Sequence, residues 1–334
     1  MSTLPDRFPA LVATQEGDEV RRELTDLQAA QLPEGAVTVR VRYSSVNYKD
    51  ALAVSPKGNV ARISPLVPGI DLAGEVIDSG DPSVLVGSEV IVHGHDLGVA
   101  RHGGFAAYAR VPAEWVVALP DGLTVRQAMA LGTAGFTAAL SVARLQAHGC
   151  RPEDGPVLVL GASGGVGATA VAILASTGYE VHAATGKDRG ELLRALGASE
   201  VLTREETSAE SKRPLEGQRW AACVDPVGGA SLAYALRTLR YGGAVVSSGL
   251  TGGVPLHTTV LPFILRSVAL LGIDSVQAPM SERRRTWERL AGDLRPAGLD
   301  EHLTREVALE EVDALLDDVL AGQGTGRTVV RVAG

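Results

Sequence analysis

The part of the sequence best suited to holding a phosphate group is a glycine-rich turn at residues 161–167, Gly-Ala-Ser-Gly-Gly-Val-Gly. It follows a predicted strand, Val157 to Leu160, and precedes a predicted helix, Ala168 to Ala175. Glycine lets backbone N–H groups approach a pyrophosphate, and the start of a helix favours negative charge. A plain strand-to-helix turn is the alternative. The flanking strand and helix favour dinucleotide binding, with contacts from Ser163, Gly164, Gly165 and Val166.

The end of the next predicted strand indicates which dinucleotide binds. NAD sites usually place an acidic residue there to bond the ribose 2′-hydroxyl, but this strand ends in Thr185, Gly186 and Lys187. A carboxylate would repel a 2′-phosphate, whereas a hydroxyl and an ammonium would bind it. Arg204, after the third predicted strand, could supply a second cation, and Asp188 is the nearby counterexample. We expect NADPH to be preferred over NADH, with a solvated side chain as the alternative for Lys187.

Two regions of different pattern would position these residues. Residues 35–120 hold short β-branched runs broken by glycine and proline, which predicts an all-β, barrel-like region. From residue 124 a helical stretch leads into short apolar strands that alternate with helices, which predicts a parallel, doubly wound sheet. Its six strands are expected near Val157–Leu160, Glu180–Thr185, Glu200–Leu202, Trp220–Asp225, Ala244–Ser248 and Val268–Ile273.

The end of the chain carries two further predicted elements. Ser281 to Leu294 is expected to form a surface helix, and the adjacent Arg283, Arg284 and Arg285 a solvated helix face. These arginines could instead contact a phosphate of coenzyme A. Thr328 to Val332 is a predicted strand that could return to the first region.

The composition excludes several classes of protein. The chain has 334 residues and a formal net charge of −8 without a long basic run, so neither nucleic acid nor a membrane is an expected partner. The first thirty residues contain no apolar segment typical of a signal sequence. The two cysteines, Cys150 and Cys223, fit buried thiols in a reducing compartment better than a disulfide. We therefore expect a cytoplasmic globular protein.

Several short segments are distinctive in combination. They are Ser-Val-Asn-Tyr-Lys-Asp at 45–50, Pro-Gly-Ile-Asp-Leu-Ala-Gly at 68–74, His-Gly-Gly-Phe-Ala at 102–106, Gly-Thr-Ala-Gly-Phe-Thr-Ala-Ala at 132–139, Thr-Gly-Lys at 185–187, Arg-Tyr-Gly-Gly-Ala at 240–244, Pro-Phe-Ile-Leu-Arg at 262–266 and Leu-Gly-Ile-Asp-Ser at 271–275. With the glycine turn, they resemble the acrylyl-coenzyme A reductase type of zinc-free quinone oxidoreductase, in the medium-chain dehydrogenase/reductase superfamily.

The resemblance implies an α/β protein of two domains. A GroES-like β-barrel catalytic domain would occupy residues 1–123 and be completed by 274–334, and a Rossmann NADPH-binding domain would occupy 124–273. It also implies NADPH-dependent reduction of the C=C bond of a short 2-enoyl-CoA, acrylyl-CoA above all. Further cofactor contacts are expected from Thr137, Gly249, Leu250 and Arg327.

The segment Asn47 to Asp50 offers an amide, a phenol, an ammonium and a carboxylate where this superfamily carries catalytic groups. Hydride addition to the β-carbon of an enoyl thioester builds enolate charge on the carbonyl oxygen, and a proton must then reach the α-carbon. Tyr48 is the first choice of donor, and Asn47 and Asp50 are the other candidate catalytic residues. The alternative for Tyr48 is an aromatic ring packed at the domain boundary with its hydroxyl satisfied.

No metal site is expected. Zinc-dependent relatives place a cysteine within the segment 47–50 and a histidine where Ile70 stands, and have four closely spaced cysteines, none of which occurs here. His93, His95 and His102 could converge on a metal, but interrupting glycines favour histidines that are hydrogen-bonded or exposed.

Two other functions remain open, a quinone reductase that uses the same cofactor and an NADPH-binding protein without turnover. The apolar segment Ser267 to Asp274 would leave an open sheet edge unless it is paired, which predicts a homodimer.

Overall fold

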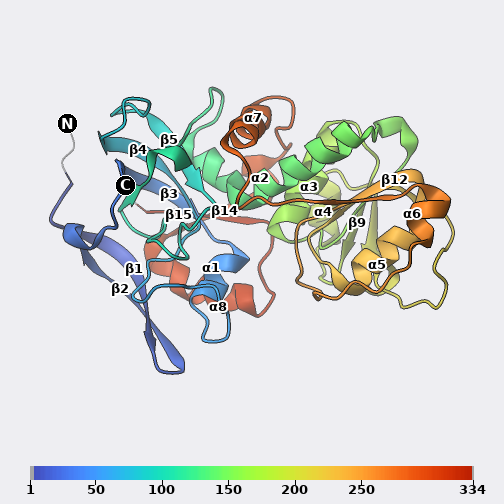
Figure 1. Ribbon diagram of the computed structural model, residues 1–334, viewed down its shortest axis with the longest axis horizontal. Coiled ribbons are helices and arrows are strands. Elements are labelled where there is room, and N and C mark those ends of the chain that lie inside the picture. The colour runs from blue at the N-terminus through green and yellow to red at the C-terminus, as the bar shows by residue number, and fades with distance from the viewer. Residues whose placement is uncertain (1–3, 333–334) are drawn as a thin grey trace. The chain divides into compact units, whose positions relative to one another are not determined.

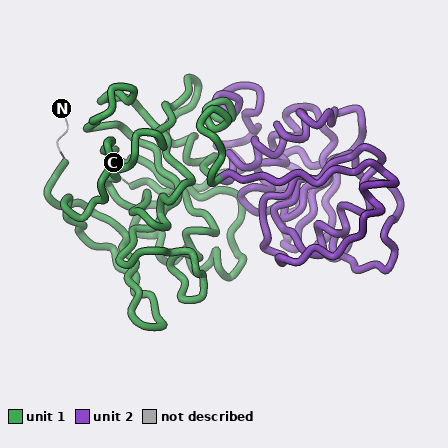
Figure 2. The backbone as a smooth tube through the Cα atoms, in the orientation of Figure 1, with its two compact units in different colours: residues 1–133, 276–287, 304–334 green, residues 134–275, 288–303 purple. Residues whose placement is uncertain are grey.

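The computed structural model describes residues 4–332 and divides the chain into two compact units (Figures 1 and 2). Unit 1 comprises the chain up to Thr133, Val276–Trp287 and the residues from Thr304 onward, and unit 2 comprises Ala134–Ser275 and Glu288–Leu303. The first boundary lies later than the predicted position after residue 123. Helix α2 (Val125–His148) begins in unit 1 and is interrupted at Gly132 by non-helical backbone, just before the division. The return of residues 288–303 to unit 2 was not predicted.

Unit 1 is built on a mostly antiparallel seven-stranded sheet. In it β15 pairs with β3 in antiparallel register, so the predicted return of the C-terminal strand is confirmed. The all-β region predicted for residues 35–120 is also confirmed, because β3 to β7 lie within it. The strands are β3 (Val37–Ser45), β4 (Asp71–Ser79), β5 (Glu89–His93), β6 (Tyr108–Val111), β7 (Val117–Ala118), β14 (Thr304–Ala308) and β15 (Arg327–Arg331).

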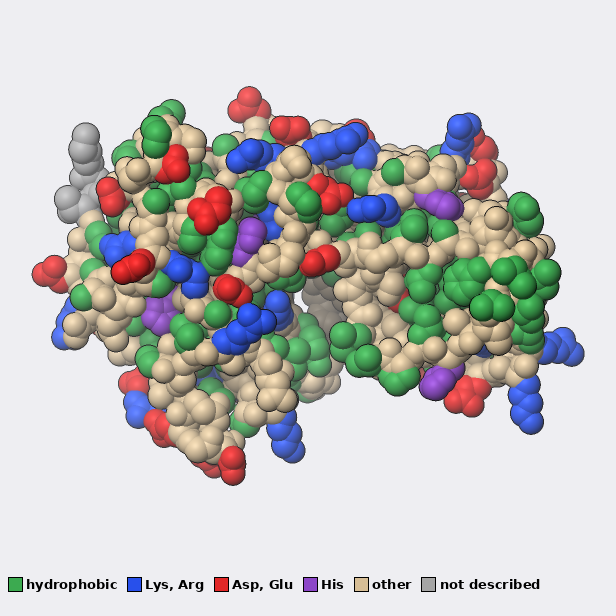
Figure 3. Space-filling model, in the orientation of Figure 1, with side chains coloured by type: hydrophobic (Ala, Val, Ile, Leu, Met, Phe, Trp, Pro, Cys, Tyr) green, Lys and Arg blue, Asp and Glu red, His purple; other side chains and the backbone are tan. Residues whose placement is uncertain are grey.

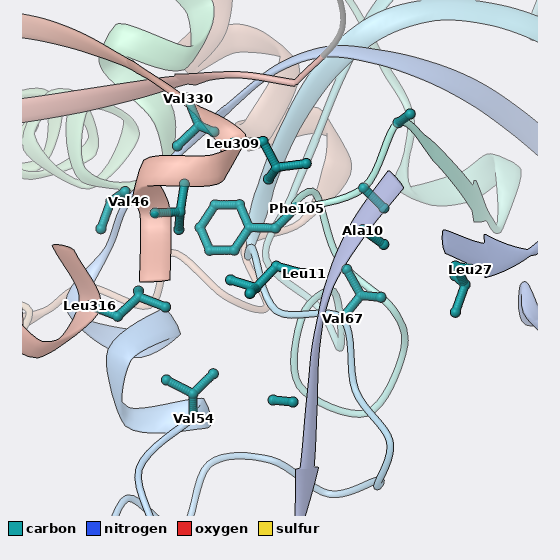
Figure 4. Packing of buried hydrophobic residues seen from close by; sticks show 14 of the residues in the cluster. Ala10, Leu11, Leu27, Val46, Val54, Val67, Phe105, Leu309, Leu316 and Val330 are labelled. Carbon is teal, nitrogen blue, oxygen red and sulfur yellow. The ribbon is translucent and has the colours of Figure 1, made fainter. Parts of the chain in front are cut away.

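Unit 1 also contains a hairpin and two helices that lie wholly within it. The hairpin joins β1 (Arg7–Glu16) to β2 (Glu19–Gln28), and the helices are α1 (Tyr48–Ala53) and α8 (Val312–Leu320). They enclose an apolar cluster around Phe105, which Figure 4 shows with Val46 among its neighbours. Because Val46 is buried in this cluster, it fixes the backbone just before Asn47 and the start of α1.

Unit 2 is a parallel six-stranded sheet in the order β10-β9-β8-β11-β12-β13, which confirms the doubly wound prediction. Its strand order reverses between β8 and β11, where open α/β sheets bind their ligands. The strands are β8 (Val157–Val159), β9 (Val181–Thr185), β10 (Glu200–Thr203), β11 (Trp220–Asp225), β12 (Leu239–Ser247) and β13 (Ala269–Gly272). Helices α3 (Gly165–Ser176), α4 (Gly190–Ala195), α5 (Gly229–Thr238) and α6 (Leu261–Arg266) belong to this unit.

Two helices cross the division between the units. α2 is long and apolar enough to cross a membrane by length and composition, but 83% of its most apolar window is buried inside the fold, as in the core helix of a globular protein. Helix α7 (Met280–Ala291) is the predicted surface helix, and for Arg283 that prediction is wrong. Arg283 is fully buried, while Arg284 and Arg285 are exposed.

Candidate functional site

The glycine turn of unit 2 follows β8, as predicted, but its last three residues form the first turn of α3, which begins at Gly165 and not at the predicted Ala168. Gly161 has a φ of +56°, which an L side chain rarely adopts, and Gly164 is the residue before the first turn of α3. A Cβ on Gly167 would lie 2.4 Å from the carbonyl oxygen of Gly161, so only glycine lets the helix pack this closely on the turn. The backbone N–H groups at the start of α3 are the kind of donors that hold a pyrophosphate.

The end of β9 brings hydroxyl groups and cations together. The hydroxyls of Ser163 and Thr185 lie 2.8 Å apart, and the Lys187 N–H donates to Thr185 Oγ1 at 3.1 Å. Burial, with the charges of Arg189 and Arg204, lowers the pKa of the Lys187 ammonium. A bound anion such as a phosphate would reduce the repulsion between these neighbouring positive charges.

Arg204 lies directly against Gly186. A Cβ on Gly186 would come within 2.9 Å of three guanidinium atoms of Arg204. The bare backbone at this position therefore lets an exposed arginine approach the predicted phosphate site, which the sequence indicated only through the presence of Arg204.

The other predicted cofactor residues of unit 2 lie on α2 and in the turn after β12. Thr137 is buried on α2, whereas Gly249 and Leu250 follow β12. A Cβ on Gly249 would lie 2.2 Å from the carbonyl oxygen of Pro226, so this turn also depends on glycine. Cofactor contact by these residues stays a prediction.

Sequence reasoning missed Asp225, at the end of β11. Its buried carboxylate accepts the N–H groups of Val227 and Gly228 at 2.9 and 2.8 Å and the hydroxyl of Ser247 at 2.9 Å. Burial raises the pKa of Asp225. The carboxylate shapes the turn at the edge where the strand order reverses, and the segment Asp-Pro-Val-Gly-Gly at 225–229 was the available signal.

Unit 1 contains a buried network centred on Asp71, which is 0% exposed. Its carboxylate accepts hydrogen bonds from Ser45 Oγ at 2.6 Å, Asn47 Nδ2 at 2.8 Å, and both the N–H (3.0 Å) and the hydroxyl of Thr133. Arg327 lies 3.9 Å from the carboxylate and donates to Ser45 Oγ at 2.9 Å and Asn47 Oδ1 at 3.2 Å. The charge of Asp71 is therefore balanced and its oxygens are occupied.

Gly132 makes this network sterically possible. Its φ is +53°, and a Cβ there would lie 2.5 Å from Asp71 Oδ2, 2.6 Å from Arg327 and 2.7 Å from Ser45 Oγ. The interruption of α2 at this glycine places the Thr133 N–H and hydroxyl against Asp71.

Asp50, a predicted catalytic residue, is fully buried and holds backbone. It accepts the N–H groups of Gly69 at 3.1 Å, Ile70 at 2.8 Å and Asn47 at 2.8 Å. Burial, and next the charge of Asp71, raises its pKa to about 7. This position suits the anchoring of α1 to the loop before β4 better than contact with a substrate.

Asn47 and Tyr48, the other two predicted catalytic residues, lie at the start of α1. The Asn47 side chain is bound at both ends, by Asp71 and Arg327. Tyr48 is the first residue of the helix and is 48% exposed. Among residues 4–332, no hydrogen bond involves its hydroxyl, so a fixed helix start presents a phenol with an open hydrogen-bonding position.

Arg327, predicted to contact the cofactor, is 2% exposed and bonded within unit 1. Besides Ser45 and Asn47, it donates to the carbonyl of Ala130 at 2.9 Å. This geometry gives it a role in holding Asn47, and contact with the cofactor stays a prediction.

Comparisons with known proteins agree with this arrangement. The model of the alcohol dehydrogenase GroES-like domain matches residues 33–121, and the zinc-binding dehydrogenase model matches residues 165–292. Acrylyl-CoA reductase AcuI of Ruegeria pomeroyi is 49% identical over 97% of this chain and 99% of its own length. Putative quinone oxidoreductase YhfP of Bacillus subtilis is 48% identical over 99% of this chain and 100% of its own length. The chain belongs to the medium-chain dehydrogenase/reductase superfamily.

Solved structures match nearly the whole chain. The yhdH oxidoreductase of Salmonella enterica, in complex with NADP, is 47% identical with a TM-score of 0.95, covering 97% of this chain and 100% of its own. The yhfP protein of Bacillus subtilis, with NAD bound, is 48% identical with a TM-score of 0.95, covering 99% and 100%. The predicted family, fold class and oxidoreductase type are therefore confirmed.

The family model that matches residues 165–292 is named for zinc binding, but the residues of this chain do not fit a zinc site. Among residues 4–332, no group of three or more His, Cys, Asp or Glu side chains is arranged to hold a metal ion. Asp71 is already surrounded by the donors described above. His93 is fully buried and hydrogen-bonded, and His102 Nδ1 accepts the N–H of Val67 at 3.1 Å.

Proposed function

We propose that the protein reduces the C=C bond of a short 2-enoyl-CoA with NADPH, with acrylyl-CoA as the expected substrate. The likeness to acrylyl-CoA reductase AcuI over nearly the full length of both chains carries this proposal. An NADPH:quinone reductase is the second candidate, favoured by the comparable likeness to YhfP. A protein that binds NADPH without turnover is the third.

The glycine turn and the end of β9 fit the dinucleotide. The start of α3 would hold the pyrophosphate, and Thr185, Lys187 and Arg204 would hold the 2′-phosphate. The polar contact between Ser163 and Thr185 supports this, because it joins the two parts of the site into one surface. NADPH, when bound, supplies the hydride.

Unit 1 supplies hydrogen-bond donors for the acceptor. The hydroxyl of Tyr48 would donate to the charge that develops on the thioester oxygen, or protonate the α-carbon. Asn47 and Asp50 hold the backbone that carries Tyr48, one through Asp71 and the other through the loop before β4. The proposed roles are therefore one donor, Tyr48, and two residues that fix its position.

The decisive experiment measures NADPH oxidation with acrylyl-CoA, crotonyl-CoA and a simple quinone under the same conditions. The proposal expects turnover with the two thioesters and the saturated thioester as product. Turnover with the quinone alone would replace the substrate assignment, and NADPH binding without any turnover would favour the third candidate. Stoichiometric zinc in protein purified without added metal would contradict the metal-free reaction.

We also propose a homodimer formed through unit 2. β13 is an edge strand of the sheet, and exposed apolar side chains lie on and before α6, including Val254, Val260, Ile264 and Leu265 at 57–77% exposed. Figure 3 shows apolar side chains gathered at the end of the view where Figure 1 places α6. An exposed apolar patch beside an open edge favours pairing.

Light scattering at micromolar concentration should give twice the mass of the chain, and Ile264→Lys should give the monomer. Leu85→Lys, at an exposed leucine of unit 1, is the matched control. A monomeric native protein would contradict the dimer. The buried free thiols Cys150 and Cys223 support a reducing, cytoplasmic location, which cell fractionation tests.

A further inference from the structure

His93 is a buried polar residue of unit 1 that the proposed chemistry does not use. It is the last residue of β5 and is 0% exposed. Trp287 of α7 donates its indole N–H to His93 Nε2 at 2.9 Å, and the two rings meet edge to face. Thr133 and Arg283 are also in contact with the imidazole.

The hydrogen-bond partners fix the proton of His93. An indole N–H can only donate, so Nε2 of His93 accepts and carries no proton. A neutral imidazole then carries its proton on Nδ1. Burial, and next the charge of Arg283, lowers the pKa of His93 well below its ordinary value, so the ring is neutral at neutral pH.

Arg283 holds the ring from one face. Its NH1 lies 3.0 Å from His93 Nδ1 and 3.1 Å from Nε2. In the ring plane, an atom at these distances would overlap the C–H group between the two nitrogens, so the guanidinium lies over the ring. NH1 also donates to the His93 carbonyl at 3.0 Å, and NH2 donates to the Val276 carbonyl at 3.1 Å. Gly94 leaves room for the guanidinium group of Arg283, because a Cβ there would lie 3.1 Å from both NH1 and NH2.

From Nδ1 a series of hydrogen bonds leads to the start of α1. Thr133 Oγ1 lies 3.4 Å from His93 Nδ1 and gives its own proton to the carboxylate of Asp71. The threonine oxygen is therefore the acceptor for the Nδ1 proton. Asp71 in turn accepts from Asn47 Nδ2 at 2.8 Å, directly before Tyr48.

We propose that His93, as the Nδ1-protonated tautomer, is a positioning residue that orients Thr133 and, through Asp71, fixes Asn47 and the start of α1 for the reaction. The inference rests on the proposed function, because Tyr48 is the group being positioned. The segment Val276–Trp287 returns to unit 1 and contributes Arg283 and Trp287. These two residues hold His93 in one orientation.

The first test is independent of activity. In protein labelled with ¹⁵N-histidine, long-range proton–nitrogen NMR spectra should show His93 protonated on Nδ1 and not on Nε2, with His93→Gln to assign the signals. Trp287→Phe removes the donor to Nε2, so signals of the other tautomer should appear. Trp220→Phe is the matched control, because Trp220 is equally buried in unit 2 and its indole nitrogen has no hydrogen-bond partner among the described residues. A protonated Nε2 in the native protein would overturn the inference.

The second test separates positioning from general stability. Thr133→Val keeps the shape but removes the hydroxyl between His93 and Asp71, and should lower kcat roughly tenfold while KM for NADPH stays within about twofold. Thr238→Val removes a buried hydroxyl of unit 2 that, among the described residues, is bonded only to carbonyls of its own helix, and this variant should leave kcat unchanged.

The double variant Thr133→Val/Trp287→Phe should be no slower than the slower single variant, because both changes interrupt one series of hydrogen bonds. Additive losses, or an unchanged kcat in Thr133→Val, would overturn the inference. If the native enzyme reduces only a quinone, the proposed substrate fails, whereas the nitrogen spectrum still decides the tautomer of His93.

Discussion

The candidate site of unit 2 is built from backbone groups, whereas that of unit 1 is built from side chains. Unit 2 uses backbone, since its turn depends on Gly161, which has a positive φ, and on Gly167, where a Cβ would meet the carbonyl of Gly161. Unit 1 uses buried side chains, since Asp71 and Arg327 hold Asn47 from both sides. A backbone site needs glycines at fixed spacing, whereas a side-chain network needs partners that are far apart in sequence. The two sites should therefore fail in different ways when they are mutated.

The largest expected difference concerns two buried aspartates that accept backbone N–H groups, Asp50 in unit 1 and Asp225 in unit 2. The pKa of Asp50 is about 7 in the folded protein against an ordinary 3.8. Between these values the folded state keeps a proton that the unfolded chain has lost. The stability contributed by Asp50 is thus complete at low pH and is lost as pH rises through 7, by up to about 1.4 kcal/mol per pH unit.

Asp50→Asn lacks this loss, so its free energy of unfolding should improve relative to the native protein as pH rises toward 7. Asp225→Asn should change in the same direction but less, because burial raises the pKa of Asp225 without a second buried carboxylate among its causes. Denaturant titrations at several pH values measure both. Parallel pH curves for the native protein and Asp50→Asn would contradict the assignment.

Gly132→Ala should destabilise the protein by about 3 kcal/mol, because it combines a positive φ with a methyl group pressed onto Asp71 and Arg327. Gly17→Ala is the control, since Gly17 also has a positive φ but has open space around it. Thermal or chemical unfolding of both variants separates the steric contact from the backbone strain. Equal losses in the two would show that the network tolerates the methyl group.

Lys187→Ala should weaken NADPH binding roughly tenfold and leave NADH binding nearly unchanged, because one charge-assisted phosphate contact is worth about 1.5–3 kcal/mol. The native protein should bind NADPH at least about tenfold more tightly than NADH for the same reason. Fluorescence titration of both reduced cofactors measures this. The relative crystallised with NAD makes the comparison informative, and equal affinities in the native protein would refute the preference.

Gly186→Ala should have the smallest effect, a loss of a few-fold in NADPH affinity with unchanged stability. Its methyl group would meet the end of the Arg204 side chain, which can move aside, whereas Gly132 faces fixed groups. Replacing Arg204 with Ala in the Gly186→Ala variant should then lower the NADPH affinity little further. A full further loss would show that Arg204 binds the phosphate from a position that Gly186 does not control.

The same contrast explains what could be predicted from the sequence. The glycine turn, the six parallel strands and the cation after β9 each depend on neighbours in sequence, and all three are where they were expected. The hairpin of β1 and β2 was missed, because β1 contains Pro9 and β2 is highly charged. The burial of Arg283 was missed because its partner His93 is 190 residues away in the sequence.

Asp50 shows what could not be predicted from the sequence within the candidate site. Residue type and position made it a candidate for catalysis, but its three backbone partners come from the start of α1 and from the loop before β4. A carboxylate that holds backbone and one that contacts substrate look alike in sequence. Only the burial and the partners distinguish them.

We infer that unit 1 supplies the donor for the chemical step while unit 2 holds the cofactor, and Tyr48→Phe separates these two roles. With acrylyl-CoA as acceptor, kcat should fall roughly 10²-fold, and the NADPH dissociation constant should stay within about twofold because the phosphate groups bind to unit 2. Tyr241→Phe, at an exposed tyrosine of unit 2, should leave both values unchanged. A fall in kcat of less than about fivefold would contradict the claim and assign the proton to water or to Lys49.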